Sequence, residues 1–432
     1  MDGQGAIEWI HSTCKLGSKL GLENVAELSR RMGDPHRRFS SVHVAGTNGK
    51  GSVCAMLYTT LRAAGYRTGL FTSPYLVDFR ERIQADGDLI PYADLARIAD
   101  RVRDAVDGMI ADGWNHPTEY EIVTVIGFCY FAEMGLDAAV IEVGLGGRLD
   151  MTNIITPDLC VITPISLDHT KILGDTIAKI AYEKAGIIKK GIPVVSAIQE
   201  PEAARVLREI AGERGAPITF ADGQDVRVTS AGLEGQIIDF RMNGQWETDH
   251  ALPLVGAHQA ENALTARLAV EELRRLGYAV PDEALRQGLG RACWPGRVEV
   301  AGKCPLVILD GTHNPAGAMA LRDAVSLFLS GKKTVLLMGM MEDKDSSKVA
   351  AILAPMADEA IVTRVDNPRA MDTKRLAEIV GEYVPVQSAD DPAKALANAK
   401  ELAGRDGVVL VTGSLYLIGA VKEALGQTAV VP

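Results

Sequence analysis

The segment over residues 41–52, SVHVAGTNGKGS, constrains the fold of this chain more than any other. A short β-branched run enters a glycine-rich turn and then a lysine, which is how a phosphate-binding loop leaves a strand and opens a helix. The glycines let the backbone curl until N–H groups converge on phosphate oxygens, and the helix adds its positive end. Lys50 can then reach the outer phosphates, and Ser52 can offer a hydroxyl to Mg²⁺. The segment therefore predicts an ATP-binding α/β domain.

The match to the usual phosphate-loop pattern, G-x-x-x-x-G-K-[ST], is irregular. Val44 stands where that pattern has its first glycine, and Gly51 stands where it has a hydroxyl residue. A glycine-rich turn between strand and helix that binds no phosphate stays open as the alternative interpretation.

The composition is that of a soluble globular protein with more than one domain. The 432 residues suggest two or three domains, and 47% of them are hydrophobic. A net charge of −11 and a pI near 5.3 argue against nucleic acid as a partner, because such partners select basic surfaces. No signal peptide is apparent, and the most apolar segment, residues 122–131, is too short to cross a membrane. We expect a cytoplasmic protein with no membrane partner, whose six scattered cysteines are reduced core thiols and not metal ligands.

Apolar β-rich runs alternate with segments of helical spacing along the first part of the chain. The expected strands are 42–45, 138–143, 159–163 and 193–197, and the clearest helical segments are 51–64, 176–187 and 258–276. This alternation predicts a mostly parallel sheet covered by helices. Short alternating runs with glycines between residues 221 and 254 predict a small antiparallel part.

A second α/β domain is predicted after the segment CWPGR, residues 293–297, where proline and glycine interrupt the pattern. Its expected strands are 306–310, 334–338, 359–363 and 407–412, and they alternate with helical segments. We therefore expect a P-loop ATP-binding domain over residues 1–296 and a Rossmann-like α/β domain over residues 297–432.

Acidic, imidazole and amine side chains follow the predicted strands of the first domain. Glu142 ends a buried strand, where an acid is costly unless a ligand or metal pairs with it. The pair Asp168–His169 follows the next strand, and Lys184 falls on the helix after it. Taken alone, His169 could equally be a satisfied loop histidine, and Lys184 a solvated surface residue.

Together these segments resemble the Mur ligase superfamily, and in particular its folylpolyglutamate synthase/dihydrofolate synthase branch. The phosphate loop of that branch is GTNGKG[ST], which accounts for the departure at Gly51. Further matching segments are TSPYL (72–76), EVGLGGRLDMTN (142–153), LDHTKILG (167–174), EKAGIIK (183–189), GAHQAENALTA (256–266), WPGR (294–297), DGTHNP (310–315), MEDKD (341–345) and TGSLYL (412–417). Their number and order argue against a chance match.

The resemblance implies nucleotide, metal and catalytic residues. At the ATP it places Thr47, Asn48, Gly49, Lys50, Gly51, Ser52, Asn262, Arg297 and Asp310. At Mg²⁺ or Mn²⁺ it places Ser73, Glu142 and His169, with Ser52 near the phosphates; oxygen and imidazole ligands suit these ions. The catalytic residues it implies are Lys50, His169, Lys184 and Arg297. Lys184 matches a lysine that many members carry as a carbamate, which would turn a cation that repels Mg²⁺ into an anion with two oxygens.

The resemblance also implies substrate residues. It assigns His313 and Ser414 to the incoming glutamate, and Leu20, Thr118, Leu149 and Met151 to the pterin substrate. On their own, Thr118, Leu149 and Met151 read equally well as ordinary core or loop residues, and Arg297 as the partner of a nearby acid.

The activity implied is an ATP-dependent ligase that adds L-glutamate to folates, and to dihydropteroate as well, through an acyl phosphate. The expected ligands are small molecules, with K⁺ added by family analogy, and the expected state is a monomer. A ligase for UDP-muramyl peptides is one alternative, although only about forty residues precede the phosphate loop, too few for a uridine-binding domain. A non-catalytic nucleotide-binding protein is another, against which the set Lys50, Glu142, His169 and Lys184 argues. GGRLDMTN and TGSLYL leave the choice between one activity and two open.

Overall fold

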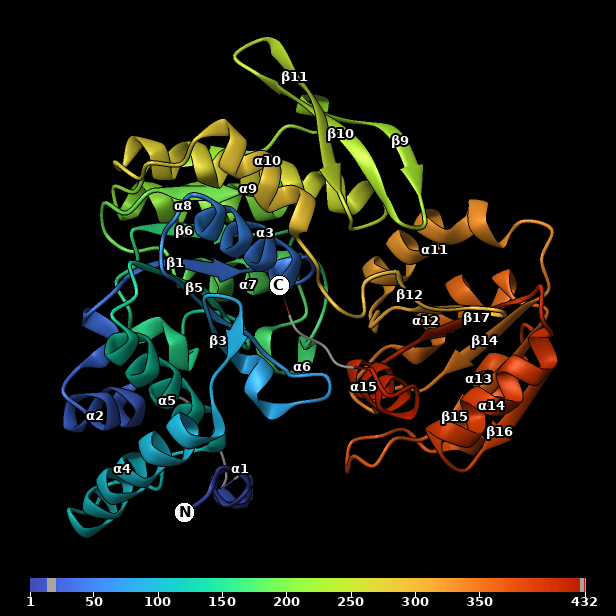
Figure 1. Cartoon of the computed structure of the whole chain (residues 1–432), viewed down its shortest axis with the longest axis horizontal. Coiled ribbons are helices and arrows are strands. Elements are labelled where there is room, and N and C mark those ends of the chain that lie inside the picture. Colours follow the sequence, from blue (N-terminus) through green and yellow to red (C-terminus); the bar gives the residue numbers. More distant parts are fainter. Residues whose placement is uncertain (14–20, 428–430, 432) are drawn as a thin grey trace.

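Three sheets organise the chain (Figure 1). The computed structural model describes residues 1–13, 21–427 and 431. The largest sheet has eight strands. Six of them, β2, β5, β1, β6, β7 and β8, are parallel, and β3 and β4 add to one edge in antiparallel pairs. In spatial order they are β4 (Asp88–Leu89), β3 (Ile83–Ala85), β2 (Thr68–Phe71), β5 (Ala138–Glu142), β1 (Ser40–Ala45), β6 (Leu159–Ile162), β7 (Val194–Ser196) and β8 (Ile218–Phe220).

Helices cover both faces of this sheet because its central strands are apolar on both sides. In β1, Val42 and Val44 point into one core, while Ala45 points into the other. One face carries α3 (Lys50–Ala63), α9 (Ala257–Arg275) and α10 (Asp282–Arg291). The other carries α1 (Gly3–Ser12), α2 (Glu23–Arg31), α4 (Tyr92–Ala111), α5 (Glu119–Met134), α7 (Ile177–Ala185) and α8 (Pro201–Glu213).

A small antiparallel sheet interrupts this arrangement, as the sequence predicted. It consists of β9 (Val226–Gly232), β10 (Gly235–Met242) and β11 (Gln245–Leu252), and it projects at the top of Figure 1. Ile238, Phe240 and Leu252 anchor it, because their side chains belong to the same core as α3 and α9.

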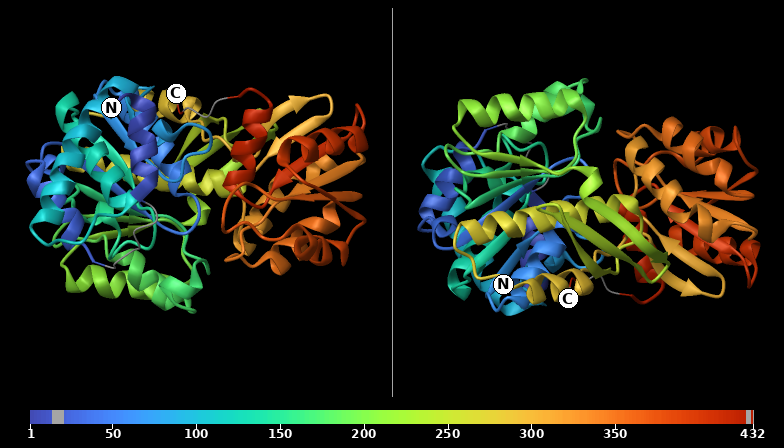
Figure 2. Two further views of the ribbon diagram at one scale, coloured as in Figure 1. Left: turned by 90° about the horizontal axis from the view of Figure 1, so that it is seen from below. Right: turned by 90° about the horizontal axis from the view of Figure 1, so that it is seen from above.

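The third sheet has six strands, all parallel except β12. In spatial order they are β12 (Glu299–Lys303), β13 (Leu306–Leu309), β17 (Val408–Thr412), β14 (Thr334–Met338), β15 (Glu359–Thr363) and β16 (Val386–Ala389). One face packs against α11 (Pro315–Leu329), α12 (Ser346–Leu353) and α13 (Thr373–Gly381). The other packs against α14 (Pro392–Ala403) and α15 (Leu415–Ala424), and Figure 2 shows this part beside the larger sheet from two further sides.

The predicted fold class is confirmed, and each predicted strand lies within two residues of an observed one. Six of the described strands were not predicted from the sequence: β2, β3, β4, β8, β12 and β16. They are short and most lie towards sheet edges, where polar residues or glycine interrupt the apolar run. The prediction of core thiols is wrong for Cys293 and Cys304, which are exposed. Among the described residues, no helix combines the length and apolarity needed to span a bilayer.

Candidate active site

The phosphate loop follows β1 at the centre of the larger sheet. Within residues 46–49, Gly46 and Gly49 have positive φ angles of 149° and 85°. A Cβ on Gly49 would lie 2.4 Å from Oδ1 of Asn262 on α9, so the position requires glycine. The first turn of α3 leaves N–H groups without intrahelical acceptors beside the cavity that this loop lines. The loop therefore has the geometry of an anion site.

The irregular position of the motif has a steric explanation. A Cβ on Gly51 would come within 2.3 Å of the indole of Trp294. Trp294 belongs to residues 292–298, the connection between the two α/β parts. A hydroxyl residue there would force the indole to shift, and it is the next residue, Ser52, that carries the hydroxyl. The Oγ of Ser52 is buried and has no hydrogen-bond partner within the described part of the chain, which leaves a polar group unsatisfied next to the loop.

A buried carboxylate faces two cations beside the loop. Lys50 Nζ folds back and donates to the carbonyls of Gly46 (3.2 Å) and Thr47 (3.3 Å). Glu142, at the end of β5, is 4% exposed and accepts from the backbone N–H of Ser73 at 3.2 Å. Burial raises the pKa of Glu142, while the charges of Lys50 and Arg297 oppose this rise. An added cation would stabilise this carboxylate further.

Lys184 reaches the same loop from α7. Its side chain is buried, and Nζ donates to the carbonyl of Gly46 at 2.6 Å. Burial, followed by the charge of Lys50, lowers the pKa of Lys184 to about 7. The interpretation of Lys184 as a solvated surface residue is therefore wrong.

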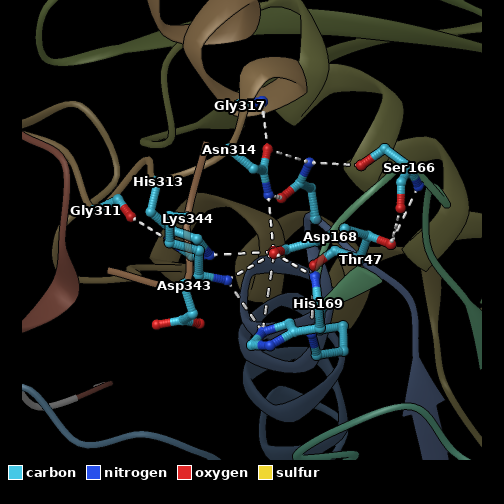
Figure 3. Close-up of polar contacts among 12 residues, drawn as sticks. Thr47, Ser166, Asp168, His169, Gly311, His313, Asn314, Gly317, Asp343 and Lys344 are labelled. Atoms are coloured by element: carbon cyan, nitrogen blue, oxygen red, sulfur yellow. Dashed lines mark hydrogen bonds and ion pairs between the residues drawn. The ribbon is translucent and has the colours of Figure 1, made fainter. Parts of the chain in front are cut away.

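Asp168 is the centre of a polar cluster that joins the two α/β parts (Figure 3). It precedes α6 (Thr170–Leu173), next to His169. Its Oδ1 accepts from Lys344 Nζ at 2.6 Å, its Oδ2 accepts from Asn314 Nδ2 at 3.2 Å, and His313 Nε2 lies 3.4 Å from Oδ2. These three partners come from the C-terminal part, so Asp168 binds one part of the chain to the other.

Burial and the charges of this cluster shift the pKa values of Asp168 and His169. Burial alone would raise the pKa of Asp168, but the hydrogen bond from His313 and the charge of Lys344 outweigh it and hold that pKa well below its usual range. Burial lowers the pKa of His169 to about 4, with Lys344 adding to the effect and Asp168 opposing it. His169 Nε2 lies 3.1 Å from Lys344 Nζ. The imidazole is therefore neutral at physiological pH, the form that can act as a metal ligand.

Two adjoining cavities are lined by most of the predicted residues. The smaller, about 170 Å³, is lined by Thr47, Asn48, Gly49, Lys50, Gly51, Ser73, Glu142, His169, Lys184, Arg297 and His313. The larger, about 670 Å³, is lined by Ser73, Thr118, Leu149, Met151, His169, His313 and Ser414. Ser73, His169 and His313 line both, so the two cavities adjoin. Ser52, Asn262 and Asp310 line neither, and Leu20 lies outside the described residues.

Several predicted ligand residues also have a structural task. The Oγ1 of Thr118 caps α5 by accepting from the N–H of Glu121 at 3.3 Å, and the Oγ of Ser414 caps α15. Asp310 accepts from the N–H groups of Val298 (3.0 Å) and Thr312 (2.9 Å). These contacts account for the burial of Asp310 and Ser414, and for the placement of the half-buried Thr118, without a ligand.

The donor set fits a hard divalent cation. Ser73, Glu142 and His169 line one cavity, and Ser52 carries an unpartnered hydroxyl in the turn beside it. One carboxylate, one imidazole and hydroxyl oxygens form an incomplete set, and Mg²⁺ commonly completes such a set with water and phosphate oxygens.

Sequence reasoning missed three residues of this region: Trp294 and Lys344, which line the cavities, and Asn314, which contacts the phosphate loop. Trp294 covers Gly51, Lys344 pairs with Asp168, and Asn314 exchanges amide hydrogen bonds with Asn48 at 3.0 and 3.3 Å. All three lie within the matching segments WPGR, DGTHNP and MEDKD. Those segments signalled the region, but they do not say which side chain points inwards.

Comparison with protein families places both α/β parts in one group. Residues 44–270 match the Mur ligase middle domain, and residues 296–415 match the Mur ligase glutamate ligase domain. The dihydrofolate synthase/folylpolyglutamate synthase of Bacillus subtilis is 37% identical over 425 residues, which cover 98% of this chain and 99% of that protein. The folylpolyglutamate synthase of Lacticaseibacillus casei is 35% identical and is covered over 97% of both chains.

Solved structures show the same similarity. A Mycobacterium tuberculosis folylpolyglutamate synthase complexed with ADP and AMPPCP superposes with a TM-score of 0.91 at 33% identity, over 99% of this chain and 100% of the other. Escherichia coli FolC in complex with DHPP and ADP superposes with a TM-score of 0.85 at 32% identity, over 98% and 97% of the two chains.

Proposed function

The chain belongs to the folylpolyglutamate synthase/dihydrofolate synthase family of Mur ligases, and we propose on this basis that it is an ATP-dependent ligase joining L-glutamate to a folate carboxylate. The observation that carries this function is the pair of adjoining cavities. Lys50, Glu142 and Lys184 line the phosphate-loop cavity from the ATP-binding part. Arg297 lines it from the connection, and His313 lines it from the C-terminal part. The adjoining cavity offers room for an acceptor whose carboxylate must reach the phosphate.

The chemistry requires activation of the acceptor, because a carboxylate is a poor electrophile. An oxygen of the folate carboxylate attacks the γ-phosphorus of ATP, which forms an acyl phosphate and releases ADP. The glutamate amine then attacks the acyl carbon, phosphate leaves and the amine loses a proton. Lys50 and Arg297 stabilise negative charge on the transferring phosphoryl group.

The enzyme uses ATP with Mg²⁺. Ser73, Glu142 and His169 would hold the ion, with Ser52 near the phosphates, and Mn²⁺ would suit the same donors. Bound Mg²⁺ neutralises charge on the phosphates. A K⁺ site belongs to this proposal by family analogy only.

Lys184 acts in this proposal as a carbamate. Its burial and its low pKa support the modification, since CO₂ reacts with a neutral amine. The neighbouring charge of Lys50 disfavours an ammonium at this position and favours an anion. The carbamate oxygens would then join the ligands of the cation.

Each substrate has its own part of the cavities in this proposal. Asn262 and Asp310 contact the nucleotide, while His313 and Ser414 bind the incoming glutamate. The pterin contacts Leu20, Thr118, Leu149 and Met151. The cluster around Asp168 helps to keep water from the acyl phosphate, which would otherwise hydrolyse.

The finer assignments belong to the same proposal. The enzyme is bifunctional and accepts dihydropteroate as well as folates, since relatives with both activities match nearly its whole length. A division at residue 296 separates the ATP-binding domain from the C-terminal ligase domain, and the enzyme is a cytoplasmic monomer.

A paired assay tests the function. ADP release is measured with ATP and glutamate, once with dihydropteroate and once with a reduced folate monoglutamate, and the amide product is identified by mass. Glutamate-dependent turnover of both acceptors is expected. Turnover of the folate alone would restrict the enzyme to tail elongation. The absence of ADP release with either acceptor would refute the ligase function.

A further inference from the structure

One face of α15 contacts parts of the molecule outside the C-terminal sheet. Leu415, Ile418, Gly419 and Lys422 are spaced i, i+3, i+4 and i+7, so they share this face. Leu415 lines both cavities, and a Cβ on Gly296 in the connection would lie 3.2 Å from Ile418. In Figures 1 and 2, α15 lies on the side of the C-terminal part that faces the larger sheet.

Gly419 occupies the interior of this helix, where glycine is intrinsically less favourable than alanine. A Cβ at this position would lie 2.0 Å from the carbonyl oxygen of Leu76 and 3.0 Å from its carbonyl carbon. The atoms that it would meet are backbone atoms, so no flexible side chain can move aside. The Leu76 side chain packs in turn against the hydrophobic core of the C-terminal part. The missing Cβ therefore permits a close contact between α15 and a loop of the ATP-binding part.

The loop that carries Leu76 is held rigidly in its own part of the molecule. The carboxylate of Glu81 accepts from the N–H groups of Leu76 (2.7 Å), Val77 (3.0 Å) and Asp78 (2.7 Å). Earlier in the same loop, the N–H of Ser73 donates to Glu142 in the phosphate-loop cavity. Because Glu81 is buried and fully engaged, the loop cannot easily yield to a displaced helix.

The far end of the same helix face is fixed to the connection. Lys422, 2% exposed, forms an ion pair with one carboxylate oxygen of Glu299. The other oxygen of Glu299 accepts from the N–H of Gly296 at 2.8 Å. The face of α15 is thus held at Lys422 by Glu299 of β12, which also accepts from the connection at Gly296, and at Gly419 by the loop that leads to Ser73.

We propose that Gly419 is a positioning residue for the ligase reaction, because its missing Cβ lets α15 seat on Leu76 and sets the distance between the two walls of the cavities. The inference rests on the proposed ligase function. A side chain at this position displaces the N-terminal end of α15, with Ser414 and Leu415, away from the phosphate loop. Glutamate capture and the exclusion of water then fail, while the nucleotide still binds to the phosphate loop.

Three helical glycines provide a matched experiment in the full-length protein. Gly419→Ala adds a Cβ at the contact with Leu76. Gly288→Ala adds one that would lie 2.4 Å from the Cα of Thr60, inside the ATP-binding part. Gly212→Ala adds one with no heavy atom of its surroundings within 4 Å. Each variant is assayed for amide formation, for ADP released per amide formed, for the Kd of ADP and for thermal unfolding.

We expect Gly419→Ala to lower kcat for amide formation by about 10- to 100-fold, the usual effect of misplacing reacting groups by about 1 Å. ADP released per amide should rise above one, because water reaches the acyl phosphate. Its Kd for ADP and its Tm should stay close to those of the wild type. Gly288→Ala should lower Tm while the coupling, that is, the ADP released per amide formed, stays unchanged. Gly212→Ala should change neither quantity.

The inference is wrong if Gly419→Ala matches Gly212→Ala in kcat and in coupling. It is also wrong if Gly419→Ala lowers Tm as Gly288→Ala does but keeps normal coupling in the folded fraction. Should Gly419→Ala not fold, Leu76→Ala takes its place, since it removes the side chain that packs against the core of the C-terminal part and so loosens the seating of α15 on this loop; a wild-type ratio of ADP released per amide in that variant would overturn the inference. A wild-type protein without glutamate-dependent ADP release would instead refute the proposed function.

Discussion

The proposed carbamylation of Lys184 needs a neutral amine, and the fraction of neutral amine follows from the pKa of this residue. Burial and the charge of Lys50 lower the pKa of Lys184 from 10.5 to about 7. At pH 7, an amine of pKa 10.5 is neutral in about 3 molecules of 10,000, and an amine of pKa 7 in about half of them. The form that attacks CO₂ is therefore more abundant by roughly 10³-fold.

The hydrogen bonding of Lys184 is compatible with the product. Attack of the neutral amine on CO₂, followed by loss of one proton, leaves a carbamate with one remaining N–H. That N–H can still donate to the carbonyl of Gly46, which Nζ reaches at 2.6 Å. The new anion lies near Lys50, so the charge that disfavoured the ammonium stabilises the carbamate.

The sign of the pH dependence follows from the same pKa. Below about pH 7 the ammonium form dominates and the carbamate is lost, so activity should fall as the pH drops through this value. Dialysis against CO₂-free buffer at pH 6 should inactivate the enzyme, and bicarbonate at pH 8 should restore it.

Carbon NMR with ¹³C-bicarbonate measures the modification directly. A carbamate signal is expected in the wild type and should be absent from Lys184→Ala and Lys184→Arg. We expect Lys184→Ala to lose about 100-fold in kcat with an unchanged Tm, and a short carboxylic acid to restore part of the activity by supplying oxygens. Lys184→Arg should not be rescued, because guanidinium stays positive. A fully active wild type without a carbamate signal would refute the reasoning.

Three further predictions concern the cavity and its closure. Lys50→Ala should lower kcat by about 10² to 10³ with an unchanged Tm, and near-normal turnover would remove Lys50 from the mechanism. Glu142→Gln and His169→Ala should each raise the Mg²⁺ concentration needed for half-maximal activity, and their losses should be non-additive in the double variant if they share one ion. Asp168→Asn should destabilise the protein by roughly 3 kcal/mol at pH 7, since it leaves Lys344 buried and unpaired. Because the folded pKa of Asp168 is depressed, this difference is present above the unfolded pKa of about 3.9 and should shrink below about pH 4, which urea unfolding at several pH values can follow.

The sequence determined the local structure of the phosphate loop and the α/β class of both parts. A strand, a glycine turn and a helix are encoded in neighbouring residues, so β1, the loop and α3 could be read without tertiary information. The alternation of apolar runs and helical spacing similarly predicted β14 and β15 to the residue. The matching segments singled out Lys50, Glu142 and Lys184, all of which line one cavity.

Only the tertiary structure decided which of these segments meet. Asp168 and Lys344 are 176 positions apart, and no period in the sequence links them. Gly51 and Gly419 are both glycines within helices, yet one lies under Trp294 and the other on the backbone of Leu76. Thr118 and Ser414 turned out to cap helices with the hydroxyls that the resemblance assigned to substrates. Local pattern, helix caps included, arises from interactions along the chain, whereas the contacts of Asp168, Gly51 and Gly419 arise from the packing of segments far apart in the sequence, which sets distances that no short segment encodes.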